Sequence, residues 1–128
     1  MLRLIVFLVT CAWLGVSAAA AADLATVDPK AATAPVGDAA RGERLITQLG
    51  CGTCHVVPGV PSAQGNVGPP LTRMGGRIYI AGVLSNTPDH MIEWLRFPQR
   101  VVPNNGMPDL GINEADARDL AAFIATLK

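Results

Sequence analysis

Two cysteines and a histidine stand together in the segment CGTCH, at Cys51, Cys54 and His55. Two thiols three positions apart can each add to one vinyl group of a haem and form a thioether, and the adjacent imidazole then lies under the iron as a ligand. We therefore interpret Cys51 and Cys54 as the attachment points of a c-type haem and His55 as an iron ligand.

Three other kinds of site use the same residue types. A thioredoxin-like redox pair needs a βαβ unit, but a helical pattern precedes this motif and a loop rich in glycine and proline follows it. A zinc site needs four ligands, and beyond the motif only His90 remains as a strong donor. A Cys51–Cys54 disulfide is expected in an oxidising compartment, although a bridge across two residues is strained. The metal and disulfide alternatives stay open here.

The N-terminal segment has the features of a secretory signal. One basic residue, Arg3, precedes an apolar run, and small residues follow up to Ala22. We expect residues 1–22 to be a signal peptide cleaved at or near Ala22. The alternative is an uncleaved membrane anchor, because residues 4–22 are uncharged and just long enough to span a bilayer. Cys11 lies inside this segment, and we assign no function to it.

The rest of the chain is close to neutral. Lys and Arg together number 10, as do Asp and Glu, and removal of the signal takes away one arginine, so the net charge becomes slightly negative. There is no basic stripe for nucleic acid and no strong field to steer a partner. We expect no nucleic-acid partner.

Amphipathic helices are expected to position the motif. Residues 23–37 are rich in alanine, proline and threonine and predict a flexible leader, so the folded domain is expected over 38–128. Asp38 is a suitable N-cap for a first helix that Gly50 ends. This helix runs directly into the motif.

Two more helices follow long loops. Thr87 is a suitable cap for a second helix that Pro98 ends, and Asn113, with Asp116 three positions later, caps the last. No segment alternates convincingly as a strand. The predicted fold class is all-α, with about three main helices and long loops. So small a core is more stable when it packs around a large apolar cofactor.

From residue 38 to 128 the sequence resembles the class I cytochromes c. The resemblance rests on a first helix running into CGTCH, a GPPL stretch, a methionine in NGMPDLG and a final amphipathic helix. The stretch from GPPL to NNGMP is similar to cytochrome c domains associated with bacterial terminal oxidases. The resemblance implies that the first and last helices cross at Gly42 and near Phe123, with one covalently attached haem c between the loops. Ile46 stands where the family usually has an aromatic residue, so we expect somewhat different packing there.

The resemblance also implies a second iron ligand. Met107 matches the family's position, and thioether sulfur is a soft ligand that favours ferrous iron. Met74 and Met91 are expected to fill the core, and His90 to face solvent. Pro108 is expected to stiffen the ligand loop. Asn104 and Asn105, which come shortly before the methionine, are expected to donate to its sulfur or to turn the chain.

Further residues are expected to contact the haem. Pro69 matches the family residue whose carbonyl binds the ligating imidazole, and Leu71 is expected to pack on the ring. Arg77, Tyr79 and Trp94 are the expected donors to the haem propionates, which need hydrogen bonds when buried. Arg77 as a surface charge and Trp94 as core remain the alternatives.

The expected function is to carry single electrons between respiratory redox partners, because an iron with both axial positions filled binds no substrate. It is thus expected to be no enzyme. The expected partners are a terminal oxidase, a cytochrome complex or a dehydrogenase, docking transiently around Cys51, Gly52 and the loop 57–61. Two alternatives stay open: a haem subunit permanently bound to an oxidase or dehydrogenase, and a haem sensor or peroxidase with an open sixth site. We expect a periplasmic monomer, bound to the membrane only if its N-terminal segment stays uncleaved.

Overall fold

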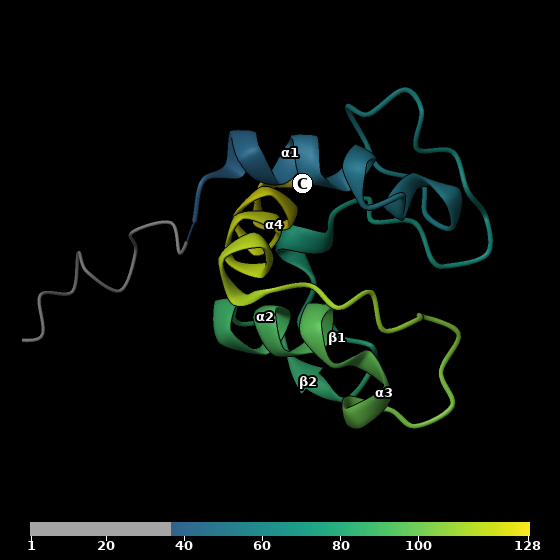
Figure 1. Ribbon diagram of the computed structural model, residues 1–128, viewed down its shortest axis with the longest axis vertical. Helices are drawn as coiled ribbons and strands as arrows, with labels where there is room; N and C mark the ends of the chain where they lie inside the picture. Colours follow the sequence, from purple (N-terminus) through teal and green to yellow (C-terminus); the bar gives the residue numbers. More distant parts are fainter. Residues whose placement is uncertain (1–36) are drawn as a thin grey trace, which may run out of the picture. The chain divides into compact units, whose positions relative to one another are not determined.

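The computed structural model describes residues 37–128, so the predicted signal peptide and all but the last residue of the predicted leader lie outside the described residues. This part is mostly helical (Figure 1). None of its helices is long and apolar enough to cross a membrane. Its helices are α1 (Ala39–Gln48), α2 (Pro88–Arg96), α3 (Pro98–Val101) and α4 (Glu114–Thr126), joined by two 3₁₀ turns (Cys51–Thr53 and Met74–Gly76) and a hairpin of β1 (Tyr79–Ile80) and β2 (Leu84–Ser85).

The first helix begins and ends where the sequence predicts. The Asp38 carboxylate accepts hydrogen bonds from the N–H groups of Ala40 at 2.9 Å and Arg41 at 3.1 Å, as an N-cap residue does. After α1, Gly50 adopts a left-handed φ of 72°, which ends the helix and turns the chain into the cysteine motif.

The caps of α2 and α4 are also confirmed. Thr87 Oγ1 accepts a hydrogen bond from the His90 N–H at 3.3 Å, and Pro88 occupies the first helical position. Asn113 Oδ1 accepts from the Asp116 N–H at 2.9 Å, while Asn113 Nδ2 donates to the Asp116 carboxylate at 2.8 Å.

A small hairpin corrects the expectation that no strand forms. β1 and β2 pair antiparallel, with Ile80 opposite Leu84, and Ala81 and Gly82 take left-handed φ values of 50° and 76° in the turn. Positive φ at two consecutive turn residues matches the right-handed twist of the strands it joins. Strands of two residues are too short to show an alternating pattern in the sequence.

The short helix α3 is a second correction, because the sequence predicted no helix directly after Pro98. Phe97 leaves the helical conformation at φ −140°, and Pro98 begins a new helix, a position that suits its fixed φ. In the sequence, such a one-residue break is indistinguishable from the end of a helix. The loop rich in glycine and proline that follows the cysteine motif also ends in a 3₁₀ turn, Met74–Gly76.

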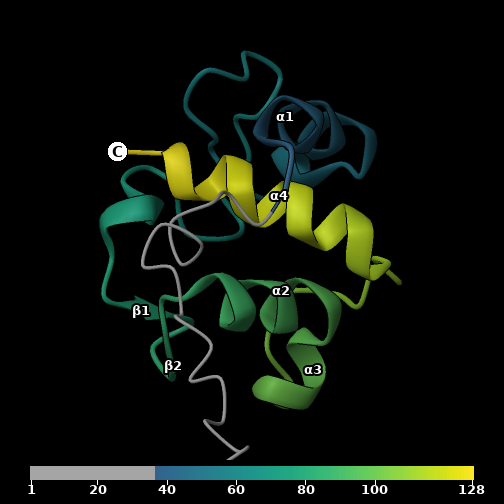
Figure 2. The same cartoon turned by 90° about the vertical axis from the view of Figure 1, so that its left-hand side faces the viewer.

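Helices α1 and α4 cross at the predicted glycine. A Cβ added to Gly42 would lie 2.0 Å from the Asp119 carbonyl oxygen and 2.8 Å from Phe123 Cβ, so the two helices touch there without an intervening side chain. Figure 2 shows α1 nearly end-on and α4 from the side, so the two helices cross steeply. Ile46 is 1% exposed and fills the core beside the crossing. The predicted stripe of α4 is buried: Ala117, Leu120, Ala121 and Ile124.

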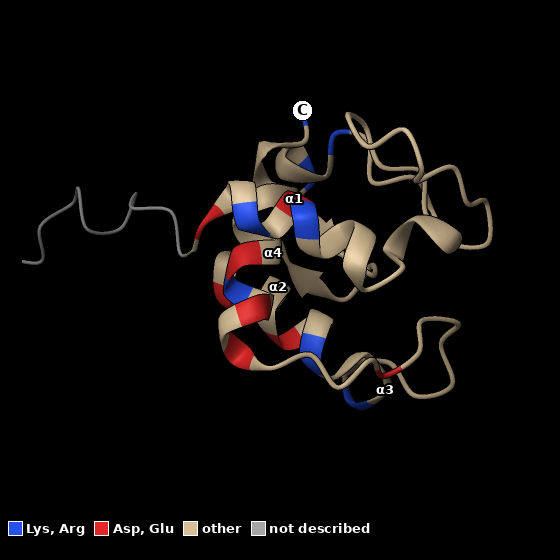
Figure 3. Cartoon of the chain, turned by 45° about the horizontal axis from the view of Figure 1, so that its top comes forward, with Lys and Arg blue, Asp and Glu red and all other residues tan. Residues whose placement is uncertain are grey.

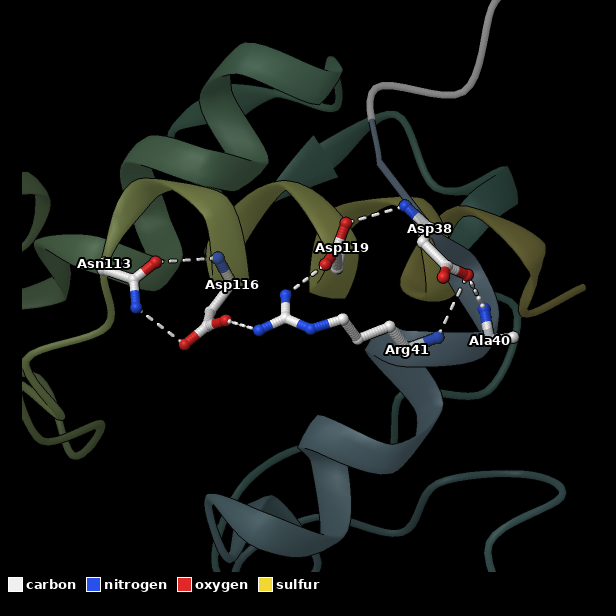
Figure 4. Close-up of polar contacts among 6 residues, drawn as sticks. All are labelled: Asp38, Ala40, Arg41, Asn113, Asp116 and Asp119. Atoms are coloured by element: carbon white, nitrogen blue, oxygen red, sulfur yellow. Dashed lines mark hydrogen bonds and ion pairs between the residues drawn. The ribbon is translucent and has the colours of Figure 1, made fainter.

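One arginine ties the two helices together (Figure 4). The Arg41 guanidinium pairs with the carboxylates of Asp116 and Asp119, which lie three residues apart on α4. Asp119 also accepts a hydrogen bond from the Asp38 N–H at 2.7 Å. The pairing with Arg41, supported by this backbone bond, holds the pKa of Asp119 below its ordinary value.

The two methionines expected to fill the core do so. Met74 is 7% exposed and Met91 is 5% exposed, and both belong to the main hydrophobic cluster. The turn that carries Met74 is fixed to the end of the chain, because the Gly75 N–H donates to the Leu127 carbonyl at 2.9 Å.

Candidate functional site

The cysteine motif occupies a tight turn directly after α1. The Cys51 carbonyl accepts hydrogen bonds from the N–H groups of Cys54 at 3.2 Å and His55 at 3.0 Å. Cys51 and Cys54 are both half-buried, and no disulfide joins them. Within residues 37–128, no group of three or more His, Cys, Asp or Glu side chains is placed to hold a metal ion.

The ring of His55 is held on two sides. Its Nδ1 atom lies 2.7 Å from the Pro69 carbonyl oxygen. Because a carbonyl only accepts, Nδ1 carries the proton of the neutral imidazole, and Nε2 keeps its lone pair. Gly68 lies against the ring. The imidazole is therefore in the tautomer that ligation through Nε2 requires.

Main-chain hydrogen bonds fold the next loop back onto the motif. The Gly68 N–H donates to the Cys54 carbonyl at 2.8 Å, and the Leu71 N–H donates to the Val56 carbonyl at 2.9 Å. These two bonds bring the GPPL stretch beside the motif and so place the Pro69 carbonyl within reach of the imidazole.

Met107 lies in the loop between α3 and α4. Figure 1 shows this loop on the same side of α4 as the long loop that follows the cysteine motif. Met107 is half-buried and packs against the core. The fold thus directs the two loops that carry the expected iron ligands to one side of the last helix.

Sequence reasoning missed a residue that holds this loop. Gln99, on α3, donates from Nε2 to the Met107 carbonyl at 2.7 Å. A single glutamine in a four-residue helix produces no pattern that predicts such a contact. Of the two roles expected for Asn104 and Asn105, turning the chain is confirmed, because Asn104 takes a φ of 62° and the Asn105 N–H donates to the Val102 carbonyl at 3.3 Å. Asn105 also directs Nδ2 to the carbonyls of Pro98 at 2.9 Å and Val102 at 2.7 Å.

The other expected haem contacts have different environments. Leu71 and Trp94 are half-buried and pack against the core. Tyr79 is 58% exposed. His90 is half-buried, and its Nδ1 lies 2.9 Å from both the hydroxyl and the carbonyl oxygen of Ser85. His90 was expected to face solvent, and it is only partly exposed because the hairpin, which the sequence did not predict, binds its ring.

Arg77 is exposed and braces the GPPL stretch. Its guanidinium donates to the carbonyls of Pro70 at 2.8 Å and Thr72 at 3.1 Å. It also lines a cavity of about 410 Å³ together with Arg73 and Lys128. Neither His55 nor Met107 lines this hollow, whereas Arg77, an expected propionate donor, does.

Exposed apolar residues lie next to the expected haem contacts in the sequence. Val67 is 78% exposed and precedes Gly68, Ile78 is 76% exposed and follows Arg77, and Leu110 is 41% exposed and follows the Met107 loop. The lone pair on Nε2 of the imidazole and two cysteines that form no disulfide fit a covalently held haem.

Residues 39–128 match the cytochrome c family. This chain belongs to that family. It is also 34% identical over 89 residues to cytochrome c oxidase subunit 2 of Alkalihalophilus pseudofirmus. The match covers 69% of this chain and 25% of the relative, so this cytochrome c spans about a quarter of the relative's length.

Membership in the family confirms the predicted class I cytochrome c fold and the predicted cofactor. This cytochrome c carries haem c, covalently attached through Cys51 and Cys54 of its C-x-x-C-H motif. It is a haem-based electron-transfer protein.

Proposed function

We propose that this cytochrome c is a single-haem electron carrier whose iron is bound by His55 and Met107. The observation that carries the proposal is the hydrogen bond between His55 Nδ1 and the Pro69 carbonyl, 2.7 Å long. It leaves Nε2 unprotonated on the turn that carries both attachment cysteines, as iron ligation requires.

Met107 is the second ligand in this proposal. Of the methionines in residues 37–128, Met74 and Met91 are buried in the protein core, whereas Met107 lies in a loop between a glycine and a proline. A thioether is a soft ligand that favours ferrous iron and raises the reduction potential.

The bound haem supplies one-electron chemistry. With His55 and Met107 both bound to it, the iron would offer no position to a substrate. The chain's own residues then hold the two ligands in place in both oxidation states. Pro69 and Gly68 do so for His55, and the amide side chains of α3 and its following loop do so for Met107.

The oxidase relative supports a terminal oxidase as the redox partner. We propose that this chain passes electrons to an oxidase of that class, as a free carrier in the periplasm or as a bound subunit. Periplasmic location rests on the signal-like features of residues 1–22. Purification from native membranes distinguishes the two forms, because only a bound subunit brings the oxidase with it in stoichiometric amount.

The proposed docking face is uncharged. No Asp, Glu, Lys or Arg occurs from residue 45 to 72, and Figure 3 shows most of the charged residues on the helices. Val57 and Val60, from the loop expected to dock partners, are buried. Val67 is exposed in the same uncharged stretch and is the apolar side chain that we assign to this face.

The visible spectrum of the ferric holoprotein tests the ligand assignment. We expect the weak far-red band of ferric iron bound to methionine sulfur in the parent protein and its loss in Met107→Leu. Met91→Leu is the matched control, since it makes the same change in the core and is expected to keep the band. A high-spin parent spectrum without the band would contradict the proposal and favour the sensor or peroxidase alternative.

A further inference from the structure

The side chain of Gln99 uses all its polar atoms on the loop that carries Met107. Its Nε2 donates to the carbonyls of Asn105 at 3.0 Å and Met107 at 2.7 Å. Its Oε1 accepts a hydrogen bond from the Asn104 N–H at 3.1 Å. One carboxamide on α3 thus binds three main-chain groups within four consecutive residues.

Asn105 makes the reverse connection, from the loop to α3. Its Nδ2 donates to the carbonyls of Pro98 and Val102, and its Oδ1 accepts from the Met107 N–H at 2.7 Å. Side-chain amides therefore bind both main-chain polar groups of Met107: Asn105 binds the N–H, and Gln99 binds the carbonyl.

The helix to which these amides attach the loop is itself well anchored. Pro98 is fully buried. The guanidinium groups of Arg96 and Arg100 lie 4.7 Å and 4.0 Å from the centroid of the Phe97 ring, and Arg100 pairs with Glu93 of α2 at 3.6 Å. The amide contacts therefore connect Met107 to the packed part of the molecule.

We propose that Gln99 and Asn105 form an amide clamp, a pair of positioning residues that holds Met107 on the iron against competing ligands. The inference rests on the proposed function, in which Met107 is the axial ligand. An external ligand binds only when the methionine loop is open, so its apparent affinity scales with the fraction of open molecules. Each lost hydrogen bond raises that fraction by roughly 2-fold to 10-fold.

Imidazole binding to the ferric holoprotein tests the clamp. Gln99→Met keeps the side-chain length and removes three hydrogen bonds, so we expect imidazole to bind at least about 10-fold more tightly, measured by loss of the far-red band. Gln99→Glu is expected to act in the same direction, because a carboxylate offers no donor to the two carbonyls. Gln48→Met is the matched control. Gln48 is exposed on α1, and its variant is expected to match the parent.

If both Gln99 variants bind imidazole with the affinity of the parent, the clamp is overturned. This holds even if the variants unfold at a lower temperature, because a residue that only stabilises the fold would not change how firmly Met107 is held on the iron. Should Gln99→Met fail to fold, Asn105→Asp tests the same clamp, since it removes both donors to α3 and keeps the acceptor for the Met107 N–H. Failure of the proposed function is distinguishable, because a parent without the far-red band has no methionine ligand to hold.

Discussion

Gly68 lies directly against the imidazole ring of His55. A Cβ built on Gly68 would come within 2.4 Å of Cε1 and 2.8 Å of Nδ1 of the ring. No side chain fits at this position while the ring stays where it is. The same ring is bonded to the Pro69 carbonyl, so consecutive residues control both its orientation and its tautomer.

We expect Gly68→Ala to displace the His55 ring and weaken its bond to iron. The Cβ would overlap a ring whose Nδ1 atom is already bonded to the Pro69 carbonyl, so the ring must move away from its present position. The measurement is the fraction of high-spin ferric haem in the visible and electron paramagnetic resonance spectra. Gly76→Ala is the matched control, because a Cβ there meets nothing within 4 Å. Identical spectra for the two variants would show that Gly68 does not lie against the His55 ring in the holoprotein.

We expect Gly42→Ala to destabilise the fold. Alanine is favoured over glycine by about 1 kcal/mol in an exposed helix, but the added Cβ would lie 2.0 Å from a main-chain oxygen of α4. Because that oxygen is not the end of a flexible side chain, the helices must separate, at a cost of about 1–3 kcal/mol. Urea unfolding followed by helical circular dichroism measures the change. A more stable variant would mean that the helices cross at a greater distance.

We expect the stability to fall in acid, partly through Asp119. Arg41 and the Asp38 N–H lower the pKa of this carboxyl in the folded state. A lowered folded pKa contributes stability above the unfolded pKa, and that stability is lost as pH falls through the folded value. The urea midpoint should therefore decrease below about pH 4, and less steeply in Asp119→Asn. Glu43 is an exposed acid on α1, and Glu43→Gln is the control. Its urea midpoint should change with pH as steeply as that of the parent.

We expect electron transfer to the oxidase to depend weakly on ionic strength and to slow in Val67→Glu. The new carboxylate would have to lose its hydration when the uncharged face docks, and no charge on the partner would offset that free-energy cost. The measurement is the rate of oxidation of the ferrous protein by the oxidase at several salt concentrations. Val83→Glu, at an exposed valine in the β1–β2 turn, is the control. Equal slowing in both variants would remove Val67 from the docking face.

The site was predictable where chemistry depends on neighbours in the chain. The C-x-x-C-H motif and the helix caps at Asp38, Thr87 and Asn113 each involve residue types within a few positions of one another. Such features leave a recognisable spacing in the sequence. The elements that escaped prediction, β1, β2 and α3, are too short to produce a period.

By itself, the sequence determined the haem attachment motif, the main helices and the candidate methionine. Only the tertiary structure decided that Arg41 pairs with Asp119, residues 78 positions away in the chain, and that a glutamine and an asparagine hold Met107. The physical reason is that such contacts depend on how helices cross and loops return. Hydrogen-bond partners brought together by folding need no particular spacing along the chain, and so no local pattern records them.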